Sequence, residues 1–138
     1  MIHDCIDLHT HSNASDGSDS PREVVRKAAA AGLNVIALTD HDTLDGLDEA
    51  EDEAQKQGIV FVRGCEISTS TPWGEAHFLG LWIPHDTAAV KRLENALADT
   101  RQKRLERNLG IADRLRALGF GVSYEQAAEL AGGRIVGR

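Results

Sequence analysis

Short apolar segments alternate with helix-forming segments through the first half of the chain, and this alternation restricts the folds open to it. Strands are expected over residues 6–9, 34–39, 59–62 and 76–83. Helices are expected over 23–31 and 47–57, and a glycine follows each of them. Ser20 to Glu23 forms a capping box with a proline at the first helical position. Strands that alternate with helices pair in parallel through helical crossovers, so the sequence predicts an α/β fold.

The second half of the chain has a different pattern. A long helix rich in arginine, leucine and alanine is expected over residues 87–118. A second capping box at Ser123 to Gln126 opens a shorter helix that runs to about Ala131. No strand pattern alternates with these two helices in the sequence. We therefore expect two parts, residues 1–87 with the strands and residues 88–138 as a separate helical layer.

Charge and composition exclude several classes of protein. Fifteen Lys and Arg against 22 Asp and Glu give a net charge of −7, which argues against binding nucleic acid by bulk positive charge. The sequence has no run of about eighteen apolar residues, and its acidic N-terminus lacks the basic region of a secretory signal. Two cysteines, Cys5 and Cys65, do not make a disulfide framework. The expectation is a cytoplasmic protein that does not contact a membrane.

Residues that commonly bind metal ions recur near the ends of the expected strands. His9 and His11 stand two residues apart in an extended segment, so both imidazoles can reach one ion. The further candidates are Asp16 in a glycine-containing loop, Asp40-His41-Asp42 directly after the second strand, Glu66 after the third, and His77 in the fourth. Because the carboxyl ends of parallel strands face one crevice, we expect these side chains to lie together.

A simpler explanation has to be weighed against a metal site. A single histidine on a strand is more often a hydrogen-bonded core residue, and that is the expectation for His3 and His85. It does not explain the whole group, because buried titratable groups are costly unless they are paired or bound. Imidazoles and carboxylates without thiolates suit manganese, iron or zinc. Their number exceeds the needs of one tetrahedral ion, so two or three divalent ions that share a carboxylate are expected.

The same residues fall into ordered motifs. The motifs are Asp7-Leu8-His9-Thr10-His11-Ser12, Ser15-Asp16-Gly17, Thr39-Asp40-His41-Asp42, Gly64-Cys65-Glu66-Ile67-Ser68 and His77-Phe78-Leu79-Gly80. Together they resemble the PHP (polymerase and histidinol phosphatase) family, in the branch with 5′-to-3′ exoribonucleases and nucleoside 3′,5′-bisphosphate phosphatases. The resemblance implies a distorted (β/α)7 TIM-like barrel with a trinuclear metal centre, usually loaded with manganese.

The resemblance also implies how the ligands are divided among the ions. His9 and His11 would share one ion. Asp16 and His41 would hold a second ion, and Glu66 would bridge. These assignments rest on matching each residue of this sequence to the family's motifs, and spacing alone does not give them.

Three residues complete the expected centre. His77 would help to hold the third ion. His41 is also a catalytic candidate, because an imidazole there could protonate the leaving oxygen. Asp40 is the other catalytic candidate, as a residue that lines the site or orients a ligand imidazole. Cys65, beside Glu66, is expected to face the opposite way as a small buried apolar residue.

The long helix carries a second clue. At 100° per residue its apolar stripe consists of Val90, Leu93, Leu97, Ile111 and Leu115. Arg101, Arg104 and Asn108 fall within the same stripe, so its middle is polar. These arginines either extend to solvent or pair with a carboxylate of the barrel, or they bind phosphate, whose geometry suits the guanidinium. Lys103 and Arg107, which lie off the centre of the stripe, are weaker phosphate-binding candidates, and Arg138, at a Gly-Arg turn, is a further one. The resemblance favours phosphate binding, because it implies an insertion that contributes basic substrate contacts.

The leading hypothesis is a metal-dependent phosphoric ester hydrolase that acts on nucleotide or short RNA phosphoesters through a metal-activated water. Two alternatives stay open. One is a phosphatase for small monoesters such as histidinol phosphate, and the other is a metal-binding module without catalysis.

The sequence departs from the family pattern at its end. Full members add a histidine soon after the position of Gly137-Arg138 and an Asp-x-His near their C-terminus, but this sequence has no histidine after His85. A β/α barrel also needs about 250 residues. We therefore expect this chain to supply the N-terminal half of the barrel and a helical insertion, with an incomplete metal site and little activity alone.

Overall fold

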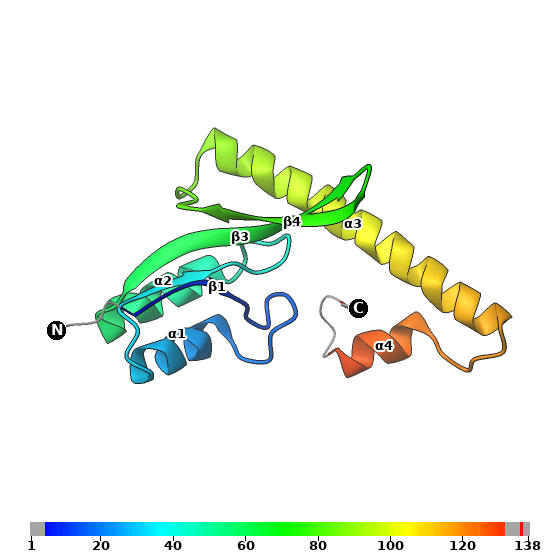
Figure 1. Ribbon diagram of the computed structural model, residues 1–138, viewed down its shortest axis with the longest axis horizontal. Coiled ribbons are helices and arrows are strands. Elements are labelled where there is room, and N and C mark those ends of the chain that lie inside the picture. Colours follow the sequence, from blue (N-terminus) through cyan, green and yellow to red (C-terminus); the bar gives the residue numbers. More distant parts are fainter. Residues whose placement is uncertain (1–4, 132–135, 137–138) are drawn as a thin grey trace.

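The strand and helix order of the chain is that of an α/β protein, which confirms the expected fold class. A computed structural model describes residues 5–131 and 136. In those residues the elements are β1 (Ile6–Thr10), α1 (Pro21–Ala30), β2 (Val35–Leu38), α2 (Leu47–Gln57), β3 (Val60–Thr71), β4 (Gly74–Leu81), α3 (Ala88–Ala117) and α4 (Tyr124–Leu130). Figure 1 shows α3 as one long helix that runs past the sheet, with α4 turned back beneath its far end.

Local sequence signals fix the helix ends. At the start of α1 the Ser20 side chain accepts a hydrogen bond from the Glu23 backbone N–H, while the Glu23 carboxylate accepts one from the Ser20 N–H. Ser123 and Gln126 make the same reciprocal pair at α4. Helix α2 ends at Gly58, whose φ of 70° lies in the left-handed region that glycine adopts without strain. The expected capping boxes are therefore confirmed.

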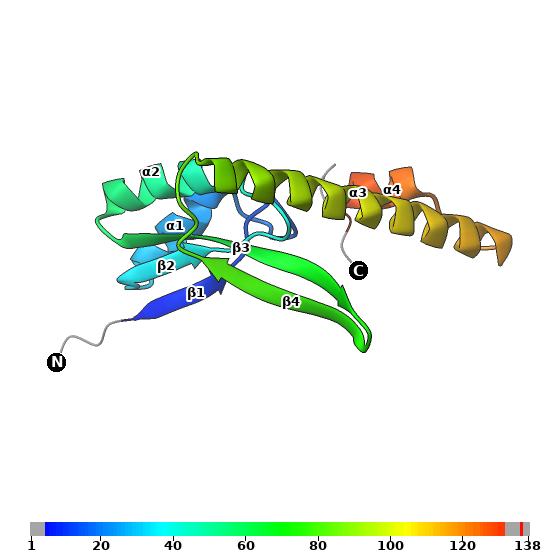
Figure 2. The ribbon, with the colours of Figure 1, turned by 90° about the horizontal axis from the view of Figure 1, so that it is seen from above.

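The sheet has the order β1-β2-β3-β4. Strands β1, β2 and β3 pair in parallel, as expected, but β4 pairs antiparallel with β3. The expectation of parallel pairing was wrong for the fourth strand, because β3 and β4 are joined by a tight turn that leaves no room for a crossover helix. The third strand is also longer than the expected segment 59–62. Figure 2 shows the β3–β4 hairpin extending beyond the ends of β1 and β2.

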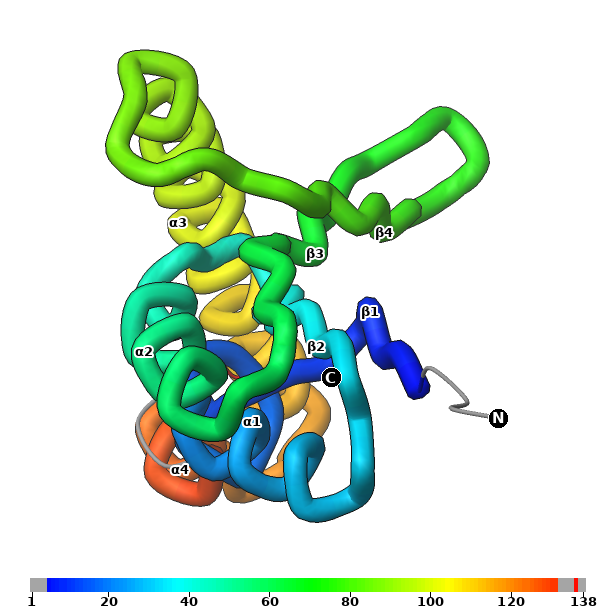
Figure 3. The backbone as a smooth tube through the Cα atoms, turned by 90° about the vertical axis from the view of Figure 1, so that its left-hand side faces the viewer, coloured from blue at the N-terminus to red at the C-terminus, as the bar shows by residue number. Residues whose placement is uncertain are grey.

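Helices α1 and α2 form a core with the sheet. Figure 3 shows both helices on the same side of the strands. The fully packed residues of this core are Val25, Ala28, Ile36, Leu38, Leu47, Ala50 and Ala54. Because β2 lies between β1 and β3, this packing holds the strand ends in register with each other. The result is a curled partial barrel with its helices outside.

The first half of α3 packs on the sheet through a second core. Val90 and Leu97 of α3 lie with Cys65 of β3 and with Ile83. Cys65 is fully buried, so its expected place among apolar residues is confirmed. The boundary at residue 88 between two parts stays a prediction. None of the helices in the described part of the chain, even the 30-residue α3, is apolar enough to cross a membrane.

The two cysteines should differ in reactivity. Burial raises the pKa of the Cys65 thiol to about 12, so the reactive thiolate is scarce at neutral pH, whereas Cys5 is exposed. A thiol reagent such as DTNB should therefore modify one thiol per native chain and both after unfolding in guanidinium chloride. Mass spectrometry of the labelled chain should place the first label on Cys5. Equal labelling of both thiols in the native protein would contradict this packing.

Candidate metal centre

The extended backbone of β1 directs two imidazoles to one point. The Nε2 atom of His9 lies 2.8 Å from Oε2 of Glu66. His11 follows β1 and places its own Nε2 3.0 Å from the same oxygen. The two rings lie 5.1 Å apart between centroids. Two residues that are separated by one position in an extended chain thus present nitrogen atoms to a single carboxylate oxygen.

The loop after β1 and the turn after β2 supply the next pair. His41 follows β2, and its Nε2 lies 3.6 Å from Oδ2 of Asp16 and 3.7 Å from Oε2 of Glu66. Asp16 also approaches His11, with 3.4 Å between its Oδ1 and the Nδ1 of that histidine. The rings of His11 and His41 are 4.7 Å apart between centroids. Asp16 therefore lies between two imidazoles on the open side of the cluster.

Glu66 lies at the centre of the cluster and inside β3. An isolated parallel bridge pairs it with His41, and its backbone carbonyl accepts a hydrogen bond from Asp42 at 2.9 Å. Its other carboxylate oxygen, Oε1, lies 2.7 Å from Nδ1 of His77. His77 reaches this point from an antiparallel strand, opposite Ser68 in the register, and not from the carboxyl end of a parallel strand as expected. The hairpin, not a crossover, brings it to the site.

Asp40 holds the loop that carries two of these residues. It is buried, and its carboxylate accepts hydrogen bonds from the Ser12 backbone N–H at 2.8 Å, the Ser12 hydroxyl at 2.6 Å and the Ser15 hydroxyl at 2.5 Å. Among the described residues its carboxylate makes no hydrogen bond to an imidazole. Gly17 closes the same loop, since a Cβ there would stand 2.6 Å from the His11 carbonyl oxygen. Asp40 therefore orders the loop of His11 and Asp16 instead of orienting an imidazole directly.

Two pKa shifts describe the charge state of the centre. Burial raises the pKa of Glu66, but hydrogen bonds from His9 and His77 outweigh it, and the net pKa lies below the usual value. Burial lowers the pKa of His41, more than the nearby carboxylates Glu66 and Asp16 raise it. At neutral pH the centre therefore contains a carboxylate and a neutral His41 imidazole, which are the forms that bind metal ions.

The donor atoms fit divalent cations. The buried Nδ1 atoms of His11 and His41 have no hydrogen-bond partner, which is costly for a polar atom unless something else binds there. Within three groups the donor atoms lie no more than 4.8 Å from one another: His9, His11 and Glu66; His11, Asp16 and His41; His41, Glu66 and His77. The groups share members, so neighbouring ions held there would share ligands.

A fourth group, Asp48, Glu51 and His85, meets the same distance limit away from this centre. Its carboxylates are already paired, because Nη1 of Arg63 lies 2.7 Å from Asp48 and 2.8 Å from Glu51. A cation would have to displace that guanidinium. The centre around Glu66 contains imidazoles and carboxylates without a competing lysine or arginine among these contacts, and it is the better candidate.

Three arginines of α3 contact the sheet or the turn after β2. Nη2 of Arg104 lies 2.5 Å from Oδ2 of Asp42, so the pairing with a barrel carboxylate that was one of the sequence alternatives does occur. Arg101 donates to the Asp42 backbone carbonyl. Arg107 lies 2.8 Å from Oε1 of Glu75. The remaining candidate, Arg138, lies outside the described residues.

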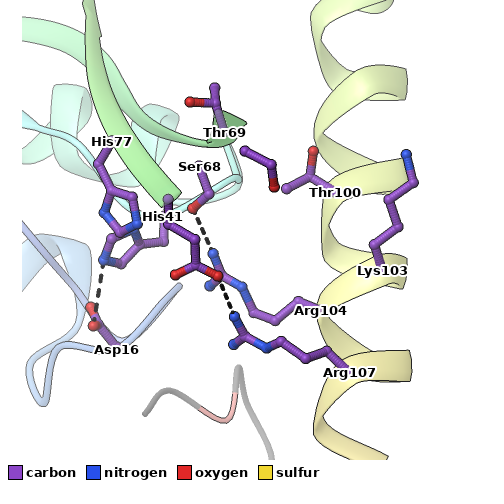
Figure 4. Close-up of a pocket in the computed structure, with 11 residues that line it drawn as sticks. Asp16, His41, Ser68, Thr69, His77, Thr100, Lys103, Arg104 and Arg107 are labelled. Carbon is purple, nitrogen blue, oxygen red and sulfur yellow. Dashed lines mark hydrogen bonds and ion pairs between the residues drawn. The ribbon is translucent and has the colours of Figure 1, made fainter. Parts of the chain in front are cut away.

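A cleft of about 920 Å³ lies between residues of the candidate metal centre and α3 (Figure 4). One wall carries Asp16, His41 and His77, and the other carries basic residues of the helix. The full lining is Asp16, His41, Ser68, Thr69, Ser70, Glu75, His77, Thr100, Lys103, Arg104 and Arg107. The cleft thus combines side chains that can bind metal ions with hydroxyl groups and cations, and hydroxyl groups and cations are the groups that bind an oxyanion.

Comparison with known proteins identifies the family. The model of the PHP domain matches residues 7–129, which include every residue of the centre. This chain belongs to the PHP domain family. The resemblance inferred from the five motifs is therefore confirmed. In this PHP domain the residues of the candidate centre come from β1, from the loop after it, from the turn after β2, and from the β3–β4 hairpin.

Relatives of this PHP domain carry several names. The chain is 41% identical over 129 residues to a 5′-3′ exoribonuclease of Haemophilus influenzae, covering 94% of this chain and 46% of that protein. It is 41% identical over 124 residues to a 3′,5′-nucleoside bisphosphate phosphatase of Chromobacterium violaceum, covering 88% and 42%. A solved structure from Bifidobacterium adolescentis, described as a metal-dependent phosphoesterase, superposes with a TM-score of 0.82 at 29% identity, covering 96% and 46%. The chain spans about half the length of these proteins.

Sequence reasoning named Asp42 only as one of the candidates after the second strand and gave Ser68 no role, but the structure places both beside α3 at the site. Asp42 is fully buried and contacts Arg104 across 62 positions of sequence. Ser68 donates its backbone N–H to Asp42 and accepts from Arg104 through its hydroxyl. The only sequence indication was that Asp42 follows His41, and Ser68 follows Glu66, within a motif. Local sequence does not show that their partner is Arg104 on α3.

Loss of the Glu66 carboxylate should reduce metal affinity most. Glu66→Gln should weaken Mn²⁺ binding by at least about 10- to 100-fold, because even residues that only support a ligand have effects of that size. Isothermal titration calorimetry on the metal-free protein measures this directly. The matched control is Glu51→Gln in the group near Arg63, which should bind Mn²⁺ like wild type. The reverse pattern would move the metal site to Asp48, Glu51 and His85.

Proposed function

We propose that this PHP domain holds the metal ions and part of the substrate-binding surface of a phosphoesterase that hydrolyses nucleotide or short RNA phosphoesters. One observation carries the proposal: Asp16, His41 and His77, which belong to the cluster around Glu66, line the same cleft as the cations of α3. Imidazole and carboxylate ligands bind divalent ions, and guanidinium and ammonium groups bind phosphate oxygens. A site with both on facing walls suits a phosphate ester better than an uncharged substrate.

The six residues His9, His11, Asp16, His41, Glu66 and His77 would hold the ions. Divalent ions bound there would polarise phosphoryl oxygens and lower the pKa of a water that attacks phosphorus. Manganese is our first choice, with iron and zinc as alternatives, because the ligands are imidazoles and carboxylates without thiolates. The ordering of the loop by Asp40 supports preformed ligand positions, which reduces the cost of binding.

The structure supports different roles for the two catalytic candidates. The lowered pKa of His41 keeps its imidazole neutral, which favours a ligand over a proton donor to the leaving oxygen. Asp40 is enclosed by Ser12 and Ser15, away from the cleft lining. We therefore assign metal binding to His41 and loop positioning to Asp40, and neither needs to transfer a proton.

The cleft and the relatives support nucleotides and short RNA as the proposed substrate class. A volume of about 920 Å³ lies at the upper end of the usual range for small-molecule sites and has room for a nucleotide. The relatives named above are an exoribonuclease and a nucleoside bisphosphate phosphatase. With a net charge of −7, the chain would attract such anions only through the local field of the ions and of the α3 cations.

The proposal predicts Mn²⁺-dependent phosphate release from 3′,5′-bisphosphoadenosine or from 5′-phosphorylated RNA, and little from histidinol phosphate. The assay should use the complete product of the gene. His9→Ala and Glu66→Ala should each reduce turnover to the metal-free background, because each removes an ion ligand. Asp52→Asn, an exposed carboxylate of α2, serves as the matched control.

The three substrates decide between the hypotheses. Faster turnover of histidinol phosphate than of the two nucleotide substrates would favour the small-monoester phosphatase over the nucleotide phosphoesterase. Tight Mn²⁺ binding with no turnover of any phosphoester would identify a metal-binding module without catalysis. Full activity of the His9→Ala and Glu66→Ala variants would contradict the metal centre itself.

A further inference from the structure

Asp42 is a fully buried carboxylate that connects the metal-binding turn to α3. We propose that Asp42 is a positioning residue, which holds the Arg104 guanidinium against the cleft so that its remaining N–H donors face a phosphate group. This inference rests on the proposed function of the cleft. It adds a residue that touches neither the metal ligands' donor atoms nor the substrate.

The carboxylate of Asp42 uses its two oxygens for different elements. Its Oδ1 accepts the Ser68 backbone N–H of β3 at 2.8 Å. Its Oδ2 accepts Nη2 of Arg104 on α3 at 2.5 Å. The Asp42 backbone carbonyl also accepts a hydrogen bond from Arg101, one turn earlier on the helix. Two arginines of α3 are thus fixed by one residue of the turn that carries His41.

The backbone of Asp42 is arranged to make these contacts. Its φ of 53° lies in the left-handed region, where residues other than glycine are uncommon but aspartate is enriched. Its N–H donates to the Glu66 carbonyl, which ties the turn to the middle of β3. The side chains of two adjacent residues therefore point to different partners. That of His41 approaches Glu66, and that of Asp42 contacts Arg104 on α3. Such a conformation is kept where surrounding contacts hold it.

The contacts leave part of the guanidinium available. Both the Asp42 and the Ser68 hydroxyl contacts of Arg104 are made by Nη2. Among the described residues no hydrogen bond occupies its Nε or Nη1, and Arg104 lines the cleft together with His41 and His77. A guanidinium has five N–H donors in a rigid plane, so two fixed contacts set the direction of the other three. Asp42 therefore determines where an anion would meet Arg104.

The variant Asp42→Asn separates these contacts. The amide oxygen of asparagine can still accept the Ser68 N–H, whereas its NH₂ group would face Nη2 of Arg104, donor against donor. The bond to β3 is kept and the side-chain bond to Arg104 is lost. Ser68→Ala removes the hydroxyl that accepts the other hydrogen bond from Nη2 of Arg104, and it leaves the buried Asp42 carboxylate unchanged.

A double-mutant cycle tests the proposal. Inorganic phosphate binding to the Mn²⁺-loaded protein should weaken by about 10- to 100-fold in Asp42→Asn and in Arg104→Ala, since misplacing a binding group has effects of that order. Adding Asp42→Asn to Arg104→Ala should cause no further loss. Ser68→Ala should cause a smaller loss that also disappears with Arg104→Ala. Asp52→Asn and Arg92→Ala, both exposed, should stay within about twofold of wild type.

Mn²⁺ affinity is the readout that separates positioning from a general structural role. Asp42→Asn should leave Mn²⁺ binding within about twofold of wild type, because the metal ligands keep their contacts. Three results would each overturn the proposal. The losses of phosphate affinity could add in the Asp42→Asn/Arg104→Ala double variant, Arg104→Ala could bind phosphate like wild type, or Asp42→Asn could lose Mn²⁺ affinity as much as phosphate affinity. If Asp42→Asn does not fold, the Ser68→Ala and Arg104→Ala pair decides in the same way. Absence of phosphoester turnover in the wild type would instead reject the proposed function, while the phosphate-binding cycle would still test Asp42.

Discussion

A single carboxylate, that of Glu66, lies within reach of four imidazoles, and the rest of the structure serves to keep it there. His9, His11 and His77 approach it at 2.7–3.0 Å, and His41 at 3.7 Å. Glu66 is 6% exposed. A buried carboxylate is surrounded here by imidazoles, and in His11 and His41 the buried Nδ1 atom makes no hydrogen bond. The free-energy cost of such an arrangement falls when cations bind.

Three consecutive residues after β2 connect this centre to the parts around it. Asp40 binds the loop that carries His11 and Asp16. His41 enters the centre, and Asp42 reaches α3 through Arg104. The core of α1 and α2 on β2 fixes where this turn begins. A short segment therefore sets the positions of the loop of His11 and Asp16, of His41, and of the basic wall of the cleft.

Much of this could be predicted from sequence because the signals are local. Helix ends follow from Ser20, Ser123 and Gly58, and the buried strand β2 follows from its apolar composition. The residues of the centre were found from side-chain type and from their place near expected strand ends. Apart from His77, their assembly around one carboxylate follows from the parallel pairing of β1, β2 and β3.

Long-range pairings could not be predicted. The hydroxyl-rich run Ser68 to Thr71 was not expected to continue β3, and the hairpin that carries His77 depends on the antiparallel pairing of that run with β4. The contact of Arg104 with Asp42 joins elements far apart in sequence. The position of Arg104 in the helix stripe therefore left three alternatives for its side chain: solvent, a carboxylate of the barrel, or phosphate. Such contacts depend on how α3 packs across the sheet, which the shared core of Cys65, Ile83, Val90 and Leu97 determines.

Anomalous diffraction from crystals grown with Mn²⁺ tests the central account most directly. The account predicts manganese peaks in the cluster, with one peak about 2 Å from an oxygen of Glu66 and from ring nitrogens of His9 and His11. A peak only at Asp48, Glu51 and His85, or Glu66 without a manganese neighbour at full loading, would contradict it.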